Sequence, residues 1–162
     1  MFKVPTARFG RTNIQIPLIT CGGMRLQHTW CPDSVPIISP NRKEVLSMPT
    51  QTNIEECIKH CLRLGINHFE TARMYGTSEY QLVDALVSLM EKGELKREDF
   101  IFQTKIVAGD EKSFDKNWKA TWDNVQRLGH VDLFSLHVIS FYDDHSKASL
   151  NYAKDLRSKG LV

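Results

Sequence analysis

Hydrophobic residues along the chain recur with two spacings, and segments of the two kinds alternate. In the first clear segment, apolar side chains fall three and four residues apart, which is the spacing of one face of an amphipathic helix. Thr52-x-x-Glu55 predicts the start of this helix as a capping box, and Gly65 predicts its end. The apolar face consists of Ile54, Cys57, Ile58, Cys61 and Leu62.

The helical spacing returns three more times. Residues 82–90 predict a helix opened by Ser78-x-x-Gln81 and closed near Gly93, and residues 114–128 predict one that ends at Gly129. A weaker pattern through residues 150–156 ends at Gly160. Short apolar runs stand between the helices and predict strands: INHFET, FIFQTK and VDLFSLH, which begin near Asn67, Phe100 and Val131, with a further strand beginning at Leu161.

Upstream, LITCGG from Leu18 predicts an additional first strand, and ARFGRTNIQIP predicts a small hairpin that turns at residues 11–13. Residues 27–50 contain four prolines and no periodicity, so they form a long connection between the first strand and the first helix. Long connections at such positions are more often functional or mobile than structural.

The predicted strands begin about 30 residues apart, which is the length of one βα unit and indicates parallel pairing. A closed (β/α)8 TIM barrel needs roughly 250 residues. The chain therefore predicts an α/β fold, a partial TIM barrel made of an N-terminal hairpin and about four βα units, as a single domain over residues 1–162. An open doubly wound sheet is the alternative. Gly22-Gly23 does not open a G-x-G-x-x-G helix start, which weighs against a Rossmann dinucleotide site.

The composition limits the classes of partner that we expect. Lysine plus arginine (21) nearly balances aspartate plus glutamate (19), so the charge gives no reason to expect nucleic acid or an anionic membrane. No apolar run approaches the ~18 residues of a membrane span, and the N-terminus lacks a signal-peptide core, so we expect a soluble, cytoplasmic protein. A small molecule or a protein is the expected partner.

The four cysteines are Cys21, Cys31, Cys57 and Cys61. Nothing indicates secretion, so we expect reduced thiols rather than disulfides. Cys57 and Cys61 could suggest a metal site on a helix face. However, both lie on the apolar face and no second ligand pair follows at zinc spacing, so packing is the favoured interpretation and no metal is predicted.

Polar residues stand where three successive strands end. Glu70 and then Tyr75 follow the second strand, Lys105 ends the third and His137 ends the fourth. In parallel α/β folds the functional site lies at the carboxyl ends of the strands. Each residue alone has a structural explanation, such as a solvated lysine or a half-buried tyrosine. Their coincidence at one edge favours a site.

These four side chains suit reduction of a carbonyl group. A tyrosine of ordinary pKa, ~10, donates a proton poorly at neutral pH unless a nearby cation favours its phenolate, and a lysine can do that. A carboxylate keeps the lysine charged, and a histidine can hydrogen-bond the substrate oxygen. Such a site needs a hydride donor from outside the protein.

The chain resembles the N-terminal part of an aldo-keto reductase. FGRTNIQIP, CGGMR, LGINHFETARMYGTSE, FIFQTK and RLGHVDLFSLH stand in that family's order and spacing. The resemblance implies a (β/α)8 barrel, preceded by a hairpin that caps its bottom, that reduces aldehydes or ketones with NADPH. It implies Tyr75 as general acid, Lys105 as the cation that favours its ionisation, Glu70 as the partner of Lys105, and His137 as the residue that orients the carbonyl.

The same resemblance implies that Gly22, Gly23 and Met24 lie near the nicotinamide. The pattern is similar to bacterial-type members, with one departure: the family's usual acid is aspartate, whereas Glu70 is one methylene longer and changes the reach of the charge. Members also continue into further βα units that carry most cofactor contacts. Two hypotheses follow: an NADPH-dependent reductase represented by part of its barrel, or a catalytically silent half-barrel that binds a partner, pairs as a homodimer or joins a missing C-terminal half.

Overall fold

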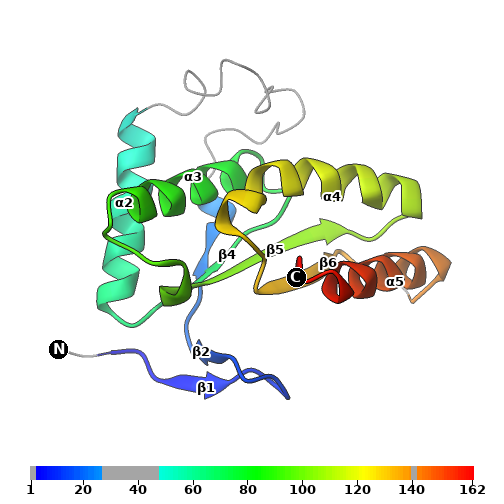
Figure 1. The fold of residues 1–162 in the computed structure, drawn as a ribbon, viewed down its shortest axis with the longest axis horizontal. Helices are drawn as coiled ribbons and strands as arrows, with labels where there is room; N and C mark the ends of the chain where they lie inside the picture. Colours follow the sequence, from blue (N-terminus) through cyan, green and yellow to red (C-terminus); the bar gives the residue numbers. More distant parts are fainter. Residues whose placement is uncertain (1–2, 27–47, 140–141) are drawn as a thin grey trace.

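The computed structural model describes residues 3–26, 48–139 and 142–162. Most of the predicted long connection, with Cys31, lies outside the described residues. The described chain begins with an antiparallel hairpin of β1 (Thr6–Arg8) and β2 (Gln15–Pro17) (Figure 1). The amide of Phe9 donates to the carbonyl of Ile14 across a turn that spans residues 11–13 (2.9 Å). The predicted hairpin is therefore confirmed.

Four parallel strands form the sheet in chain order: β3 (Cys21–Gly22), β4 (His68–Glu70), β5 (Ile101–Val107) and β6 (Leu133–His137). Each strand pairs with the next along the chain, whereas a doubly wound sheet reverses its direction of growth. The first strand is shorter than the LITCGG run. Leu161 forms no strand, although its carbonyl accepts a hydrogen bond from the amide of Val131 (3.0 Å).

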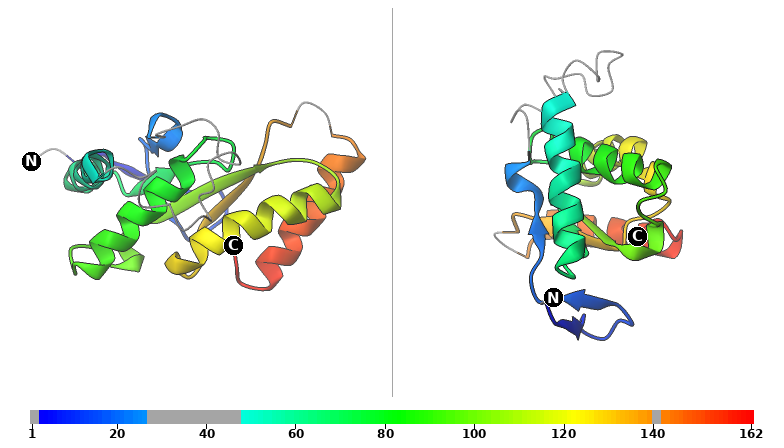
Figure 2. Two further views of the ribbon diagram at one scale, coloured as in Figure 1. Left: turned by 90° about the horizontal axis from the view of Figure 1, so that it is seen from above. Right: turned by 90° about the vertical axis from the view of Figure 1, so that its left-hand side faces the viewer.

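Four helices in the described residues follow the strands and contact one another in sequence: α2 (Met48–Arg63), α3 (Ser78–Glu91), α4 (Glu111–Val125) and α5 (Asp144–Ser158). Because each helix packs against the next, they cover the same face of the sheet (Figures 1 and 2). Short 3₁₀ turns lie at Gly23–Arg25 (η1), Arg97–Asp99 (η2) and Gln126–Leu128 (η3). Parallel strands in chain order with helices on one face match part of the wall of a βα barrel, as predicted, and not a doubly wound sheet.

The observed ends of the helices agree with the sequence prediction better than their observed starts do. Gly65, Gly93, Gly129 and Gly160 all have positive φ, as a helix terminator needs. The predicted capping box at Thr52 is wrong, because α2 already begins at Met48 and Gln51 is held by a hydrogen bond to the carbonyl of Gln81 (2.7 Å). The box at Ser78 is also wrong, because the Ser78 hydroxyl donates to the carbonyl of Gly23 instead (2.7 Å).

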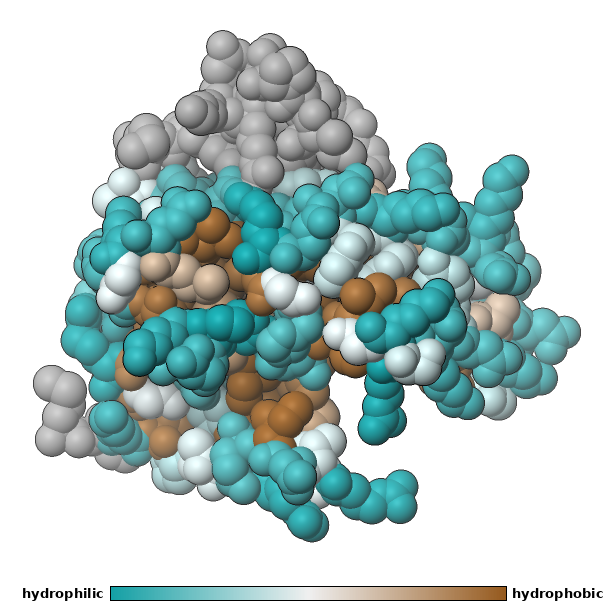
Figure 3. All heavy atoms as spheres, in the orientation of Figure 1, coloured by the Kyte–Doolittle hydropathy of each residue, from teal (hydrophilic) through white to brown (hydrophobic). Residues whose placement is uncertain are grey.

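The two faces of the sheet differ in chemistry, because successive side chains of a strand point to opposite sides. The face under the helices is apolar and buried. Its strand residues include Phe69, Phe102 and Ile106, and they pack on Leu82, Leu86 and Trp118. The face of the molecule drawn in Figure 3 is mainly polar, with several smaller apolar patches. None of the described helices has the length and apolarity that a bilayer crossing requires.

Candidate active site

The face of the sheet away from the helices carries the predicted polar residues. Glu70 is the last residue of β4, His137 is the last residue of β6, and Lys105 lies within β5. Tyr75 comes from the connection between β4 and α3. That connection runs beside β5, because the amide of Arg73 donates to the carbonyl of Lys105 (2.9 Å). This backbone contact places Tyr75 beside the lysine.

Glu70 and Lys105 form an ion pair in direct contact, with side chains that are mostly buried. The longer side chain of glutamate therefore still reaches the lysine. Burial lowers the pKa of Lys105 to about 8. The adjacent carboxylate opposes that shift, because it favours the charged ammonium.

Tyr75 lies between the lysine and the histidine. The ammonium of Lys105 stands over the Tyr75 ring, 4.6 Å from the ring centroid, which is within the range of a cation–π contact. The ring of His137 meets the Tyr75 ring edge-on, with centroids 5.4 Å apart and planes at 88°. All four predicted ionisable residues are thus brought together.

One ring nitrogen of His137 has no hydrogen-bond partner among the described residues. Its Nδ1 is buried and makes no hydrogen bond within the described part of the chain. Burial, and then the charge of Lys105, lower the pKa of His137, so the imidazole is neutral near pH 7. A buried polar atom without a partner is costly, and at a site it points to a ligand that supplies the missing bond.

The three predicted cofactor residues have different surroundings. Gly22 is exposed beside the acid: a Cβ added there would lie 3.9 Å from Oε2 of Glu70. Gly23 is buried, and a Cβ there would lie 2.8 Å from the carbonyl oxygen of Glu70 and 2.9 Å from Oγ of Ser78, so close packing requires glycine. Met24 is exposed in η1. Without a Cβ, the backbone of Gly22 beside the Glu70 carboxylate is open to solvent.

A chain of hydrogen bonds beneath the site was not predicted. Thr20 Oγ1 bonds His68 Nδ1 (2.8 Å), His68 Nε2 bonds Gln103 Oε1 (2.8 Å), and Gln103 Nε2 donates to Ser135 Oγ (2.9 Å). His68 and Gln103 precede Glu70 and Lys105 by two residues and therefore share their face of the sheet. This two-residue spacing in the sequence could have indicated that His68 and Gln103 lie on the same face as the site.

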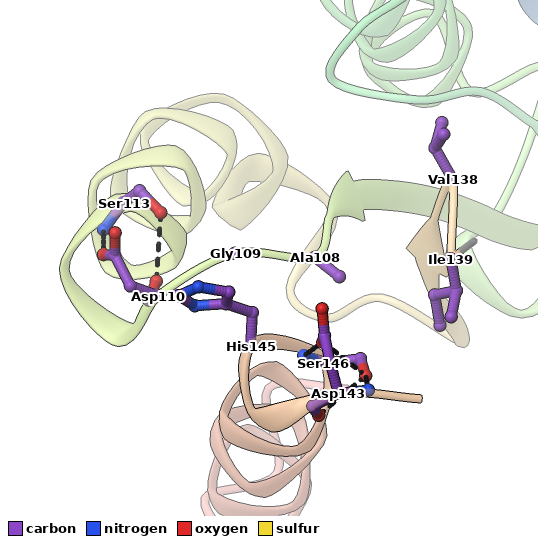
Figure 4. Close-up of a pocket in the computed structure, with 9 residues that line it drawn as sticks. All are labelled: Ala108, Gly109, Asp110, Ser113, Val138, Ile139, Asp143, His145 and Ser146. Carbon is purple, nitrogen blue, oxygen red and sulfur yellow. Dashed lines mark hydrogen bonds between the residues drawn. The ribbon is translucent and has the colours of Figure 1, made fainter. Parts of the chain in front are cut away.

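An open cavity of about 330 Å³ lies beyond the ends of β5 and β6 (Figure 4), and none of the four residues of the candidate site lines it. Gly109 and Asp110 line it from the connection between β5 and α4, Val138 and Ile139 from the segment after β6, and Asp143, His145 and Ser146 from the start of α5. Val138 directly follows His137 and has a φ of 55°, which a β-branched residue rarely adopts. Strained backbone of this kind often accompanies functional sites.

Glu79 is a further buried acid that the sequence did not reveal. It is fully buried in α3, on the helix side of the sheet, and Thr104 Oγ1 donates to its Oε2 (2.5 Å). Burial raises the pKa of Glu79. An acid in the first turn of a helix usually faces solvent and is stabilised there by the helix dipole. The position of Glu79 in the sequence therefore suggested an ordinary surface residue.

Comparison with known proteins identifies the family. A sequence model described as "Aldo/keto reductase family" matches residues 19–162. The chain belongs to the aldo/keto reductase family. Among solved structures, an aldo/keto reductase from Brucella melitensis is 21% identical with a TM-score of 0.65, over 99% of this chain and 51% of that chain. An aldo-keto reductase from Bombyx mori in complex with NADP is 19% identical with a TM-score of 0.64, over 99% of this chain and 49% of that chain.

These likenesses show a shared fold. The aldo/keto reductase chain spans about half the length of the solved structures that it resembles. The residues that match the family model, 19–162, include all four ionisable residues of the candidate site.

Proposed function

We propose that the chain forms the proton-transferring part of an aldo-keto reductase that reduces an aldehyde or a ketone to an alcohol with NADPH. The observation that carries the proposal is the position of Lys105, which contacts the Glu70 carboxylate on one side and the Tyr75 ring on the other. A general acid held beside a buried cation is the arrangement that protonates a developing alkoxide.

The residues take distinct parts in the proposed reaction. Tyr75 Oη gives its proton to the carbonyl oxygen as the carbonyl carbon accepts a hydride, and the tyrosinate regains a proton from solvent. Lys105 stabilises the negative charge that Tyr75 carries after the transfer, while Glu70 keeps Lys105 charged within a mostly buried site. Neutral His137, whose Nδ1 lacks a partner, supplies a hydrogen bond that orients the carbonyl.

The exposed backbone at Gly22 beside Glu70 fits the flat nicotinamide end of the cofactor, with Met24 close by in the chain. When bound there, NADPH supplies the hydride. The 330 Å³ cavity beyond His137 has room for the substituent of a small carbonyl substrate.

The test combines cofactor binding and turnover. Titration of the purified chain with NADPH is followed by the fluorescence of Trp118 and Trp122, which stack in α4. Turnover is followed as NADPH oxidation with an aromatic aldehyde. Tyr75→Phe is expected to keep binding and to lose turnover by at least about 100-fold, the usual contribution of general acid catalysis. The exposed Tyr142 provides the matched control Tyr142→Phe, which should change neither.

Two outcomes contradict the proposal. Turnover that survives in Tyr75→Phe would remove Tyr75 as the proton donor. Absence of saturable binding at millimolar NADPH would contradict cofactor use by this chain.

A self-assembling half-barrel is the second candidate. In the described sheet, β3 and β6 each pair on one side only, and inward residues such as Gln103 and Ser135 keep partial exposure. Unpaired edges favour association with another chain. Light scattering tests this candidate, because a monomer at all concentrations would contradict it.

A further inference from the structure

Three cysteines from two separate elements meet on the helix side of the sheet. Cys21 belongs to β3, and Cys57 and Cys61 stand one turn apart in α2. Their three Sγ atoms all lie within 4.8 Å of one another. The sequence suggested only the helical pair, because nothing in it shows that the first strand presents a third thiol to that pair.

The spacing of these sulfur atoms suits one bound metal ion. Zinc–sulfur bonds are ~2.3 Å long, so two thiolates on one tetrahedral zinc lie roughly 3.8 Å apart. The upper bound of 4.8 Å on the Sγ separations is about 1 Å longer than that value. Among the described residues, no fourth histidine, cysteine or carboxylate joins the group. Such a site therefore leaves one coordination position for water or another small ligand.

The surroundings allow an ion to enter. All three cysteines are only partly buried, whereas cysteines that merely fill a core are usually fully buried.

We propose that Cys21, Cys57 and Cys61 form a three-thiolate site for one zinc ion or a similarly thiophilic divalent metal. Binding replaces the thiol protons, which pass to solvent, and joins β3 to α2. The site lies behind the candidate active site and not in it: Cys21 faces α2, while the next residue, Gly22, lies beside Glu70 on the opposite face. Metal binding is therefore expected whether or not the chain turns over an aldehyde.

Cobalt(II) is the spectroscopic probe, because thiolate ligands give charge-transfer absorption that histidine and carboxylate ligands do not. The chain is kept reduced with a phosphine, which competes weakly for metal, and is titrated with cobalt and then with zinc. We expect one cobalt per chain, displacement by one zinc, and loss of reactivity of three thiols toward a thiol reagent. The midpoint of thermal unfolding should rise with zinc concentration.

Cysteine variants locate the site. Cys21→Ser, Cys57→Ser and Cys61→Ser should each weaken binding at least about tenfold and remove part of the charge-transfer band. Cys31→Ser is the matched control, because Cys31 is the remaining cysteine of the chain, and it should bind as the wild type does. Circular dichroism without metal checks that each variant is folded.

The wild-type measurements decide the matter even if a variant does not fold. A reduced wild-type chain that gives no charge-transfer band, or in which zinc protects fewer than three thiols, overturns the proposal. So does binding that is lost only in Cys31→Ser. A disulfide between two of the three cysteines under air, with no metal binding under the phosphine, would instead assign the cluster to redox chemistry.

Discussion

Replacement of Glu70 by glutamine tests the electrostatics of the site most directly. The substitution keeps the shape of the side chain and removes the charge that contacts Lys105. Burial alone then acts on the ammonium, and burial disfavours the charged form. We therefore expect the pKa of Lys105 to be lower in Glu70→Gln than in the wild type.

The size of the shift follows from the ion pair. Two unit charges ~4 Å apart interact by ~4 kcal/mol at an effective dielectric constant of ~20. The side chains of Lys105 and Glu70 keep 14% and 20% of their exposure, so solvent screens part of this interaction. If about half remains, ~2 kcal/mol corresponds to a fall of roughly one to two pKa units, at 1.36 kcal/mol per unit.

The pKa can be read without any activity. Reductive methylation of lysines with ¹³C-formaldehyde gives resolved methyl signals whose shifts follow ionisation, and Lys105→Arg assigns the signal of Lys105. The control is Glu94→Gln, which removes one of two carboxylates from Lys59 on the surface (2.7 Å). Surrounding water should keep the change at Lys59 small. An unchanged titration of Lys105 in Glu70→Gln would refute the assigned role of Glu70.

The same substitution has a signature in stability. The pKa of Lys105 in the folded state lies below the ~10.4 of an unfolded lysine, so the unfolded chain binds more protons between the two values. The free energy of unfolding therefore rises with pH across that window, and the rise is larger in Glu70→Gln. If turnover is measurable, its alkaline limit should move to lower pH in the variant.

Three further predictions concern the stability of the fold around β3, α3 and the end of β6. Gly23→Ala should lower the free energy of unfolding by about 1–3 kcal/mol, because the added Cβ would lie 2.8 Å from the carbonyl oxygen of Glu70. Gly22→Ala is the control and should change the free energy of unfolding little. Urea unfolding of both variants measures the difference. The raised pKa of Glu79 makes the wild type lose stability as pH rises above ~4.3, and Glu79→Gln should remove that loss in unfolding measured across pH. Val138→Asn should add about 1 kcal/mol of stability in the same assay, because asparagine tolerates the positive φ better; a destabilised variant would show that the valine contacts outweigh the strain.

The sequence predicted the repeating architecture because that information is local. Strand and helix alternate about every 30 residues, and glycines with positive φ end the helices where the pattern predicted. Helix starts were less predictable, since tertiary contacts decide them. Ser78 bonds the carbonyl of Gly23, 55 residues earlier, and that contact is invisible in a local S-x-x-Q pattern.

Much of the candidate site could also be predicted, for a geometric reason. Parallel strands in chain order bring Glu70, Lys105 and His137 to one face of the sheet near its carboxyl edge. The predicted strand end at Lys105 is wrong by two residues, because β5 continues to Val107. The contact between the Lys105 ammonium and the Tyr75 ring could not be predicted, because it depends on the path of residues 71–77 along β5. The buried position of Glu79 likewise depends on how α3 packs on the sheet.

The short strand β3 shows how one segment can serve two kinds of chemistry. Side chains alternate across a strand, so Cys21 and Gly22 face opposite layers although they are adjacent in sequence. One belongs to the thiol cluster with α2, and the other borders the Glu70 carboxylate. The strand has two residues, and its backbone is also held by the bond from the Ser78 hydroxyl to the carbonyl of Gly23. The proposed metal ion, by tying Cys21 to α2, would add a second restraint on the position of Gly22 and so on the edge of the candidate active site.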